Sequence, residues 1–525
     1  MNLDPQNLLD TAQARKLVTD RVNPSMAREL AVAEGVCVRP QLRSVTDRQT
    51  GREEIVALPC GSTRESRCPS CAAKAKRLRM QQCAEGWHRT DEPEPPTHDD
   101  NEPEGEDTGN GGEDAAEAPA RRRRSTRRRE DVPDLPRVAM ADRTVGVTFP
   151  GLGGRIYRPS MFVTLTLPSY GKVHAGVPVD PEAYRYRRAV LDAVLFPRLV
   201  DQFFKNLRRC AGFDVQYFAV VEPQKRGAPH LHAAIRGAIP RAILRQVVAA
   251  TYVQVWWPPF TEAEYAEGDR LPVWDGEDYV DPTSGAVLPS WRDALDANDR
   301  RPDARPAHVL RFGTQLDIRG IIAPSQDADR AIRYLVKYLT KSVTEPFTDP
   351  DHVDAAYEAH VDRLHAELRF LPCSEGCANW LRYGLQPKQP GPGLVPGKCW
   401  KKAHERECLG LGGRRVLVSR KWSGKTLTAH KADRALVVRQ VLEEAGLSAP
   451  EVDRLAAEVR TDEGQARFTW TKLEHRPAAY VGVILRSVAE RRAWRTEYEH
   501  AKTQAAERTQ AAAAGPVGGV TAMPP

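Results

Sequence analysis

The chain has 525 residues, with 77 Lys and Arg against 70 Asp and Glu, and its formal net charge of +7 favours a polyanionic partner. No apolar run approaches the roughly 20 residues of a membrane span, and the first residues lack the basic and apolar regions of a signal peptide. We therefore expect a cytoplasmic protein without membrane contact, whose ten cysteines are thiols or metal ligands rather than disulfides.

The first motif along the chain is a set of cysteines spaced like zinc ligands. Residues 38–58 have the pattern of a long hairpin, which would bring Cys37 beside Cys60. Cys83 and His88 are weaker substitutes for the first ligand, and the ordinary alternative is a group of buried thiols. The predicted structural zinc ligands are Cys37, Cys60, Cys68 and Cys71.

Residues 90–137 contain an acidic run and then an arginine run, and they nearly lack large apolar side chains. Such a segment cannot bury enough surface to offset the entropy of ordering. It suggests five parts: an amino-terminal zinc-binding module (1–89), a disordered linker (90–137), a catalytic domain (138–345), a carboxy-terminal zinc-binding and basic region (346–500) and a disordered tail (501–525).

Alternating and helical apolar patterns follow one another through the predicted catalytic domain, which indicates strands interspersed with helices. In residues 158–168, Val163 and Leu165 fall on one face and Phe162 and Thr164 on the other. We predict strands at 158–168, 215–222, 230–235 and 309–318, helices at 184–210, 238–255 and 327–341, and an irregular insertion at 256–307.

Two motifs in these elements carry chemistry. His230 and His232, one residue apart on a predicted strand, point to the same face and can share a metal ion. Tyr334 and Tyr338, four residues apart on a predicted helix, lie roughly 40° apart around its axis. Each motif alone is more often structural, because histidines on strands and aromatic residues on helices are usually packed or solvated.

The order of the motifs is more specific than either motif. A Val-Thr-Leu-Thr-Leu strand, a Lys-Arg-Gly-Ala-Pro-His-Leu-His hairpin and a Tyr-Leu-Val-Lys-Tyr-Leu-Thr-Lys helix resemble the three motifs of the HUH endonucleases. The tyrosine pair is similar to that of two-tyrosine phage initiators, and the whole chain resembles the RepSA-type initiators of actinobacterial plasmids. The resemblance implies an HUH-type α+β fold, with a central antiparallel sheet flanked by helices and zinc-binding modules before and after it. It also implies that the protein nicks and rejoins one DNA strand at a plasmid origin through a 5′-phosphotyrosine, starting rolling-circle replication.

The implied mechanism needs Mg²⁺ or Mn²⁺ at the histidine pair, to polarise the phosphate that a tyrosine attacks. Glu222 is the candidate third ligand if it pairs with His232, because a slip of one residue would turn it away. Asp317 and Gln315 are the alternatives. Lys337 could contact the phosphate or lower a phenol pKa, but a cation near the end of a helix is also ordinary.

A second cysteine cluster follows the catalytic motifs. Cys373, Cys377 and Cys399 are spaced like zinc ligands, and the fourth ligand is either His404 or Cys408. After it comes a basic strand and turn, which could contact DNA phosphates or could be an ordinary charged edge strand. The candidate DNA-binding residues there are Arg414, Arg415, Arg420, Lys421 and Lys425.

Two other functions fit the same motifs. An HUH transposase with two tyrosines has the same chemistry, and a zinc-containing DNA-binding regulator would use the histidines and tyrosines structurally. Residues 422–426, Trp-Ser-Gly-Lys-Thr, lack the upstream glycine of a phosphate-binding loop. An initiator of this kind would therefore depend on a helicase and a polymerase of the host.

Overall fold

The computed structural model divides the chain into two compact units, residues 83–425 and residues 1–82 with 426–525. Among the described residues, no helix is long and apolar enough to cross a membrane. The structure describes residues 22–89, 92, 129–144, 149–154, 156–266, 270–337, 339, 355–412, 415–444, 460–461, 463–473 and 477–513.

The unit of residues 83–425 is built on a six-stranded sheet with the path β13-β4-β8-β7-β14, in which β3 also pairs with β4. Every pairing in it is antiparallel. The sheet therefore has the antiparallel character that the family resemblance implies. Its strands are β3 (Phe149–Pro150), β4 (Ile156–Leu165), β7 (Tyr217–Pro223), β8 (Pro229–Arg236), β13 (Leu316–Ala323) and β14 (Val416–Val418).

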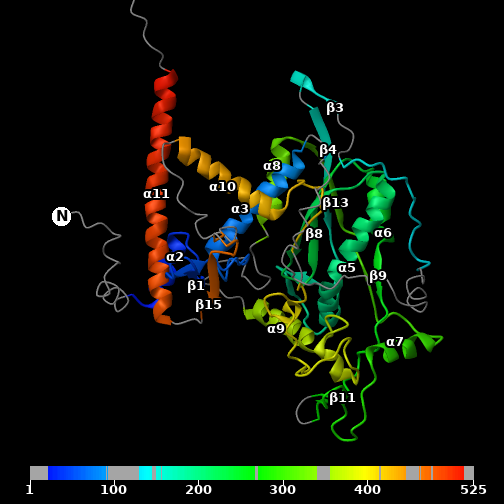
Figure 1. The fold of residues 1–525 in the computed structure, drawn as a ribbon. Coiled ribbons are helices and arrows are strands. Elements are labelled where there is room, and N and C mark those ends of the chain that lie inside the picture. The colour runs from blue at the N-terminus through cyan, green and yellow to red at the C-terminus, as the bar shows by residue number, and fades with distance from the viewer. Residues whose placement is uncertain are drawn as a thin grey trace, which may run out of the picture. The chain divides into compact units, whose positions relative to one another are not determined.

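Both faces of this sheet are covered by helices (Figure 1). On one face, Val163 of β4 and Leu231 of β8 belong to the core that includes α5 (Tyr186–Ala211), α6 (Arg241–Ala250) and α9 (Ala355–Phe370). On the other face, Phe162 of β4 and Val220 of β7 pack with α8 (Gln326–Lys337). The alternation predicted for residues 158–168 is therefore confirmed, since neighbouring side chains enter different cores.

Two predicted elements have different boundaries in the structure. The predicted helix 238–255 is helix α6 followed by strand β9 (Tyr252–Val255), and the predicted strand 309–318 is divided into β12 (His308–Arg311) and β13. Strands β9 and β12 pair with one another. The predicted irregular insertion 256–307 contains the short strands β10 (Val273–Trp274) and β11 (Tyr279–Val280) and helix α7 (Trp291–Arg300). Smaller elements of the unit are β5 (Val173–His174), β6 (Val177–Pro178) and the 3₁₀ helices η2 (Leu152–Gly154), η3 (Ala378–Tyr383) and η4 (Lys402–His404).

The other unit joins the two ends of the chain. Strand β1 (Gln41–Asp47) forms the predicted hairpin with β2 (Glu53–Leu58) and also pairs with β15 (Phe468–Lys472). Helix α2 (Pro24–Ala33) shares a small core with α11 (Pro477–Ala513). Residues 468–513 thus pack on the amino-terminal module, which the sequence analysis did not anticipate. The unit also contains α10 (Leu427–Glu444) and most of α3 (Pro69–Trp87).

The predicted division into five parts stays a prediction. Most of the predicted linker lies outside the described residues. Helix α11 extends to Ala513, inside the segment predicted as a disordered tail. The division into two compact units groups the second cysteine cluster with the catalytic motifs rather than with residues 426–500.

One buried carboxylate connects α5 to the segments around it. Asp192 is fully buried and accepts hydrogen bonds from the Tyr170 hydroxyl at 2.9 Å and from Nε2 of His308 at 2.6 Å. A buried carboxylate is tolerated only when donors replace the water it has lost. These two donors hold the loop after β4 and strand β12 against α5.

We predict that Asp192→Ala lowers the free energy of unfolding by about 3 kcal/mol, because the Tyr170 hydroxyl and the His308 ring lose their buried acceptor. Urea denaturation followed by circular dichroism measures the change. Asp201→Ala is the matched control on the same helix, where the side chain is exposed. Equal stability of the two variants would show that the buried hydrogen bonds contribute nothing.

Candidate active site and metal-binding clusters

The backbone register of β7 and β8 brings the candidate metal ligands together. Glu222 lies directly opposite His230, and Val220 lies opposite His232. The expected pairing of Glu222 with His232 is therefore wrong by two residues. Because side chains alternate with a period of two, a shift of two leaves Glu222 on the histidine face. The turn that sets this register contains Gly227 with φ of 74°.

The ligand atoms of Glu222, His230 and His232 lie within 4.8 Å of one another, as a shared metal ion requires. Oε2 of Glu222 is 2.6 Å from Nε2 of His232, whose side chain is only 3% exposed. On the other side of that ring, Nδ1 is 3.0 Å from Oγ1 of Thr164. A proton on Nδ1 that is donated to Thr164 would leave the Nε2 lone pair for a metal. The donor set of two imidazoles and one carboxylate thus fits a divalent cation.

Two neighbouring residues, which the sequence analysis missed, hold His230. The amide nitrogen Nε2 of Gln224 lies 2.9 Å from its Nδ1, and Nη2 of Arg226 lies 3.5 Å from its Nε2. Burial, followed by the charge of Arg226, lowers the pKa of His230 to about 3, so that the ring is neutral at pH 7. The guanidinium of Arg226 also donates to the carbonyls of Leu167 and Pro168, both at 3.1 Å. The basic turn 225–227 was the sequence signal for the role of Arg226, but the sequence does not show in which direction its side chain points.

Helix α8 places Tyr334 over this site. Its ring is perpendicular to that of His232, with 5.2 Å between centroids, and also perpendicular to that of Phe162 at 5.9 Å. Tyr334 is 41% exposed, so the residue is open to solvent in part. Lys337 is exposed at the end of α8. Tyr338, the other predicted nucleophile, lies outside the described residues.

The alternative third ligands do not join the site. Asp317 lies opposite Thr164 in the sheet, but its carboxylate accepts from Nε of Arg319 at 2.9 Å. Gln315 is exposed, and its backbone carbonyl accepts from the Thr166 hydroxyl. Among the described residues, Glu222 is the acidic side chain that shares a metal-sized cluster with the two histidines.

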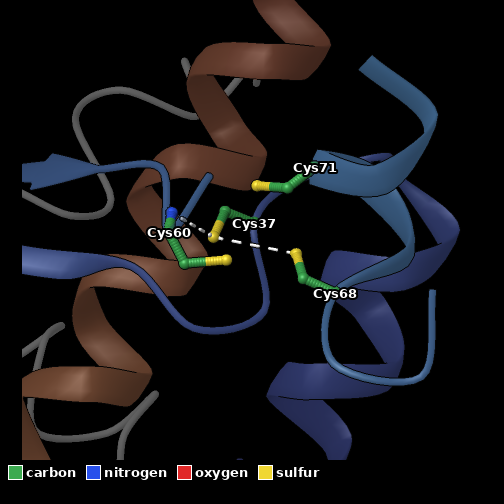
Figure 2. Close-up of side chains that lie close together, drawn as sticks. All are labelled: Cys37, Cys60, Cys68 and Cys71. Atoms are coloured by element: carbon green, nitrogen blue, oxygen red, sulfur yellow. Dashed lines mark hydrogen bonds between the residues drawn. The ribbon is translucent and has the colours of Figure 1, made fainter. Parts of the chain in front are cut away.

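The first predicted zinc cluster is assembled from two places in the amino-terminal module (Figure 2). Cys37 and Cys60 flank the β1–β2 hairpin, while Cys68 and Cys71 lie at the start of α3. The ligand atoms of all four lie within 4.8 Å of one another, and Sγ of Cys37 is 3.8 Å from Sγ of Cys68. The backbone N–H of Cys60 donates to Sγ of Cys37 at 3.3 Å. The four sulfurs form a set that could hold a zinc ion.

In the second cluster, His404 rather than Cys408 lies with the three cysteines. Cys373, Cys377, Cys399 and His404 have ligand atoms within 4.8 Å of one another. Nε2 of His404 is 3.5 Å from Sγ of Cys377, and its Nδ1 is 3.1 Å from the carbonyl of Leu368. Donation to that carbonyl fixes the tautomer that leaves Nε2 free to bind a metal. The Cys408 thiol instead contacts Glu405.

The basic strand and turn are present on the edge of the central sheet. Strand β14 pairs with β7, and the carbonyl of Arg415 accepts from the Val221 N–H at 2.8 Å. Lys421 forms an ion pair with Asp214 at 3.4 Å, and Lys425 lies 4.0 Å from Glu85. Arg420 is exposed, whereas Arg414 lies outside the described residues. The structure therefore agrees equally well with a DNA-contacting strand and with an ordinary charged edge strand.

The fold and the clusters define a mixed helix and strand protein with an antiparallel central sheet and two candidate zinc sites, one in each compact unit. The chain belongs to the RepSA family: the family model described as "Replication initiator protein, pSAM2" matches residues 24–479. A Streptomyces ambofaciens protein named "Replication initiator protein" is 28% identical over 204 residues, which cover 33% of this chain and 39% of that protein. The alignment thus spans about two fifths of that relative. No solved structure matches the chain at a significant level.

We expect the purified protein to carry two zinc ions, one in each cluster. His404→Ala should reduce the zinc content to one ion, because Nε2 of His404 lies among the three sulfurs. Cys408→Ser should keep both ions, and it serves as the control within the same segment. Plasma mass spectrometry of gel-filtered protein measures the ratio. The reverse pattern would assign the fourth ligand to Cys408.

Glu222→Gln should weaken Mn²⁺ binding at the histidine pair by about 10-fold to 100-fold, because a neutral amide replaces the charged ligand. Titration calorimetry with Mn²⁺ on the zinc-loaded protein measures the affinity. Asp317→Asn is the matched control, since this carboxylate lies on the same sheet but outside the cluster. Equal losses in the two variants would remove Glu222 from the ligand set.

Proposed function

We propose that this protein is a plasmid replication initiator with an HUH-type nickase fold, which nicks and rejoins one DNA strand at the origin. The observation that carries the proposal is the convergence of Glu222, His230 and His232, together with the contact of the Tyr334 ring with His232. Membership of the RepSA family agrees with it. The convergence adds a chemical reason, because a metal site beside a partly exposed tyrosine suits transfer of a DNA phosphate to a phenol.

The chemistry is a transesterification that conserves the number of phosphate ester bonds. A divalent ion such as Mg²⁺ or Mn²⁺, held by Glu222, His230 and His232, would polarise the scissile phosphate. The Tyr334 hydroxyl loses its proton and attacks the phosphorus, while the bond to the 3′ oxygen breaks. The products are a 5′-phosphotyrosine on the protein and a free 3′ hydroxyl, which takes up a proton and primes synthesis. Arg226, bound to two carbonyls beside His230, would hold a positive charge next to the phosphate.

A second tyrosine would end a round of replication. Tyr338 is the other candidate nucleophile, and either tyrosine could attack first. The second phenol would attack the regenerated origin, forming a new phosphotyrosine and freeing a 3′ hydroxyl. That hydroxyl would attack the first phosphotyrosine, which joins the ends of the displaced strand and releases the first tyrosine. Lys337 lies in sequence between the two tyrosines and is exposed at the end of α8, where it could contact a phosphate.

Recognition of the double-stranded origin would fall to the zinc clusters and to the basic strand, because the tyrosine site acts on a single strand. The proposed contacts are phosphate contacts of Arg415, Arg420, Lys421 and Lys425, together with Arg414. A host helicase and a host polymerase would supply strand separation and synthesis.

The two alternatives differ in what they predict. A transposase would do the same chemistry at its own terminal sequences, whereas the RepSA match supports action at a plasmid origin. A non-catalytic regulator would bind origin DNA and form no covalent product. A labelled origin oligonucleotide with Mn²⁺ therefore separates the regulator from the nickase by the presence of a covalent adduct.

We predict that Tyr334→Phe lowers the rate of adduct formation by at least about 1000-fold if Tyr334 makes the first attack, because phenylalanine has no nucleophilic oxygen. Denaturing gels of the labelled oligonucleotide measure the adduct. Tyr498→Phe is the matched control, since Tyr498 is 40% exposed and Tyr334 is 41% exposed.

The reciprocal variant distinguishes the two tyrosines. If Tyr338→Phe nicks a supercoiled origin plasmid at the wild-type rate, initiation belongs to Tyr334. If Tyr334→Phe nicks at that rate and Tyr338→Phe does not, initiation belongs to Tyr338. Normal adduct formation by the double variant would exclude both.

A further inference from the structure

A cavity of about 860 Å³ lies on the α5 side of the central sheet, apart from the tyrosine face. Its walls come from the first turns of α5, from β12 and from α9. The acidic residues of the lining are Glu182 and Glu367. The cationic residues are Arg129, Arg185, Arg187, Arg188, Arg311 and Arg363. Arginines therefore outnumber carboxylates in the lining by a wide margin.

Several of these arginines have carboxylate partners. Nη2 of Arg311 lies 2.5 Å from Asp131, which also accepts from Nε of Arg129 at 2.7 Å. Nη1 of Arg363 lies 2.5 Å from Glu182. One carboxylate thus serves two of the arginines, and its negative charge does not balance theirs.

The remaining cations gather at the start of α5. The nearest carboxylate to Arg188 is that of Asp192, 3.8 Å away, and Asp192 is already bound by Tyr170 and His308. Arg187 donates to the carbonyl of Phe260 and, within the described part of the chain, forms no ion pair with a carboxylate. Arg185 is exposed and, among the described residues, has no ion pair. The charge of this helix start is therefore left uncompensated.

The backbone of α5 adds to the same positive potential. Arg185 occupies the N-cap position and makes no capping hydrogen bond with its side chain, and the first turn contains no acidic residue. Helix starts ordinarily carry Ser, Asp or Asn at the N-cap and acidic residues in the first turn, because both compensate the free N–H groups. Arginines at this position repel the positive charge of the helix start, and an anionic ligand in the cavity would relieve this repulsion.

One residue of the cavity lining also contacts a residue of the candidate active site. Pro168 lines the cavity, and its carbonyl accepts the hydrogen bond from Arg226, whose Nη2 lies 3.5 Å from His230. In the described part of the chain, the cavity lining is thus joined to a candidate metal ligand by the contacts of Arg226 alone. Arginine is well suited to a DNA strand, because its planar donors match phosphate oxygens.

We propose that this cavity binds the phosphodiester backbone of single-stranded DNA that continues from the cleavage site, an inference that rests on the proposed nickase function. Its binding is independent of base sequence, since the lining offers guanidinium groups to phosphates. A free nucleoside triphosphate has the same phosphate chemistry and is the other source of such a ligand.

The test measures the affinity of the full chain for a fluorescent single-stranded oligonucleotide at several salt concentrations. Arg185→Glu should weaken binding by about tenfold and reduce the slope of log affinity against log salt by about 0.7, the value for one lost phosphate contact on a single strand. Arg185→Lys should recover most of the affinity. Arg245→Glu is the matched control, an exposed arginine on α6 outside the cavity lining.

Each outcome has a definite meaning. Equal affinity and salt slope in Arg185→Glu and Arg245→Glu would overturn the proposal. Binding of ATP that Arg185→Glu abolishes, with single-strand affinity intact, would also overturn it and assign the cavity to a free nucleotide. Adduct formation by the wild-type protein with Mn²⁺ is scored on the same oligonucleotide. A wild-type protein without adduct would contradict the nickase function, whereas the Arg185 comparison reports on the cavity alone.

Discussion

The arrangement of the candidate active site depends on the pairing of two strands, β7 and β8. Glu222 stands opposite His230 because a ladder of backbone hydrogen bonds runs from Tyr217–Ile235 to Pro223–Pro229. A shift by one residue would turn the histidines into the α5 core and bring Leu231 and Ala233, both fully buried, to the other face. Burying an aliphatic side chain the size of leucine stabilises a fold by about 1.5–3 kcal/mol, so apolar residues outside the site hold its register. The metal ligands therefore need no stabilising interaction of their own to stay on one face.

The sequence predicts those features that depend on local periodicity. The faces of β4, the hairpin of β7 and β8 and the side of the sheet to which Glu222 points all follow from alternation. The residue that pairs with Glu222 cannot be predicted in this way. The register of the hairpin depends on the length of its turn, and the sequence pattern does not define where the two strands end. Strand β9 was included in a helix because its partner, β12, lies more than 50 residues later in the chain. The same reason hides the pairing of β15 with β1, since a local pattern carries no information about a distant partner.

The two cysteine clusters show how much more the spacing of ligands can predict than the spacing of apolar residues. A hairpin fixes the distance between Cys37 and Cys60, so the sequence alone brings them together. Four thiols, two of them buried, would have little reason to converge without a metal, because a neutral thiol is a weak hydrogen-bond partner. The N–H of Cys60 donates to Sγ of Cys37, while burial raises the pKa of that thiol. In the second cluster the choice between His404 and Cys408 depends on a carbonyl, that of Leu368, which no spacing rule identifies.

The tyrosine and the histidines meet through an aromatic residue that belongs to neither motif. Phe162 stacks near His232 with 6.1 Å between ring centroids and meets Tyr334 edge-on at 5.9 Å. Helix α8 is held over that face by Ile332, Leu335 and Val336, which are buried on the side of the helix that faces the sheet core. The helical period then carries Tyr334 to the edge of this contact, where its ring reaches His232 while part of it stays open to solvent. The position of the candidate nucleophile is thus set by packing, and only its chemical identity is set by the motif.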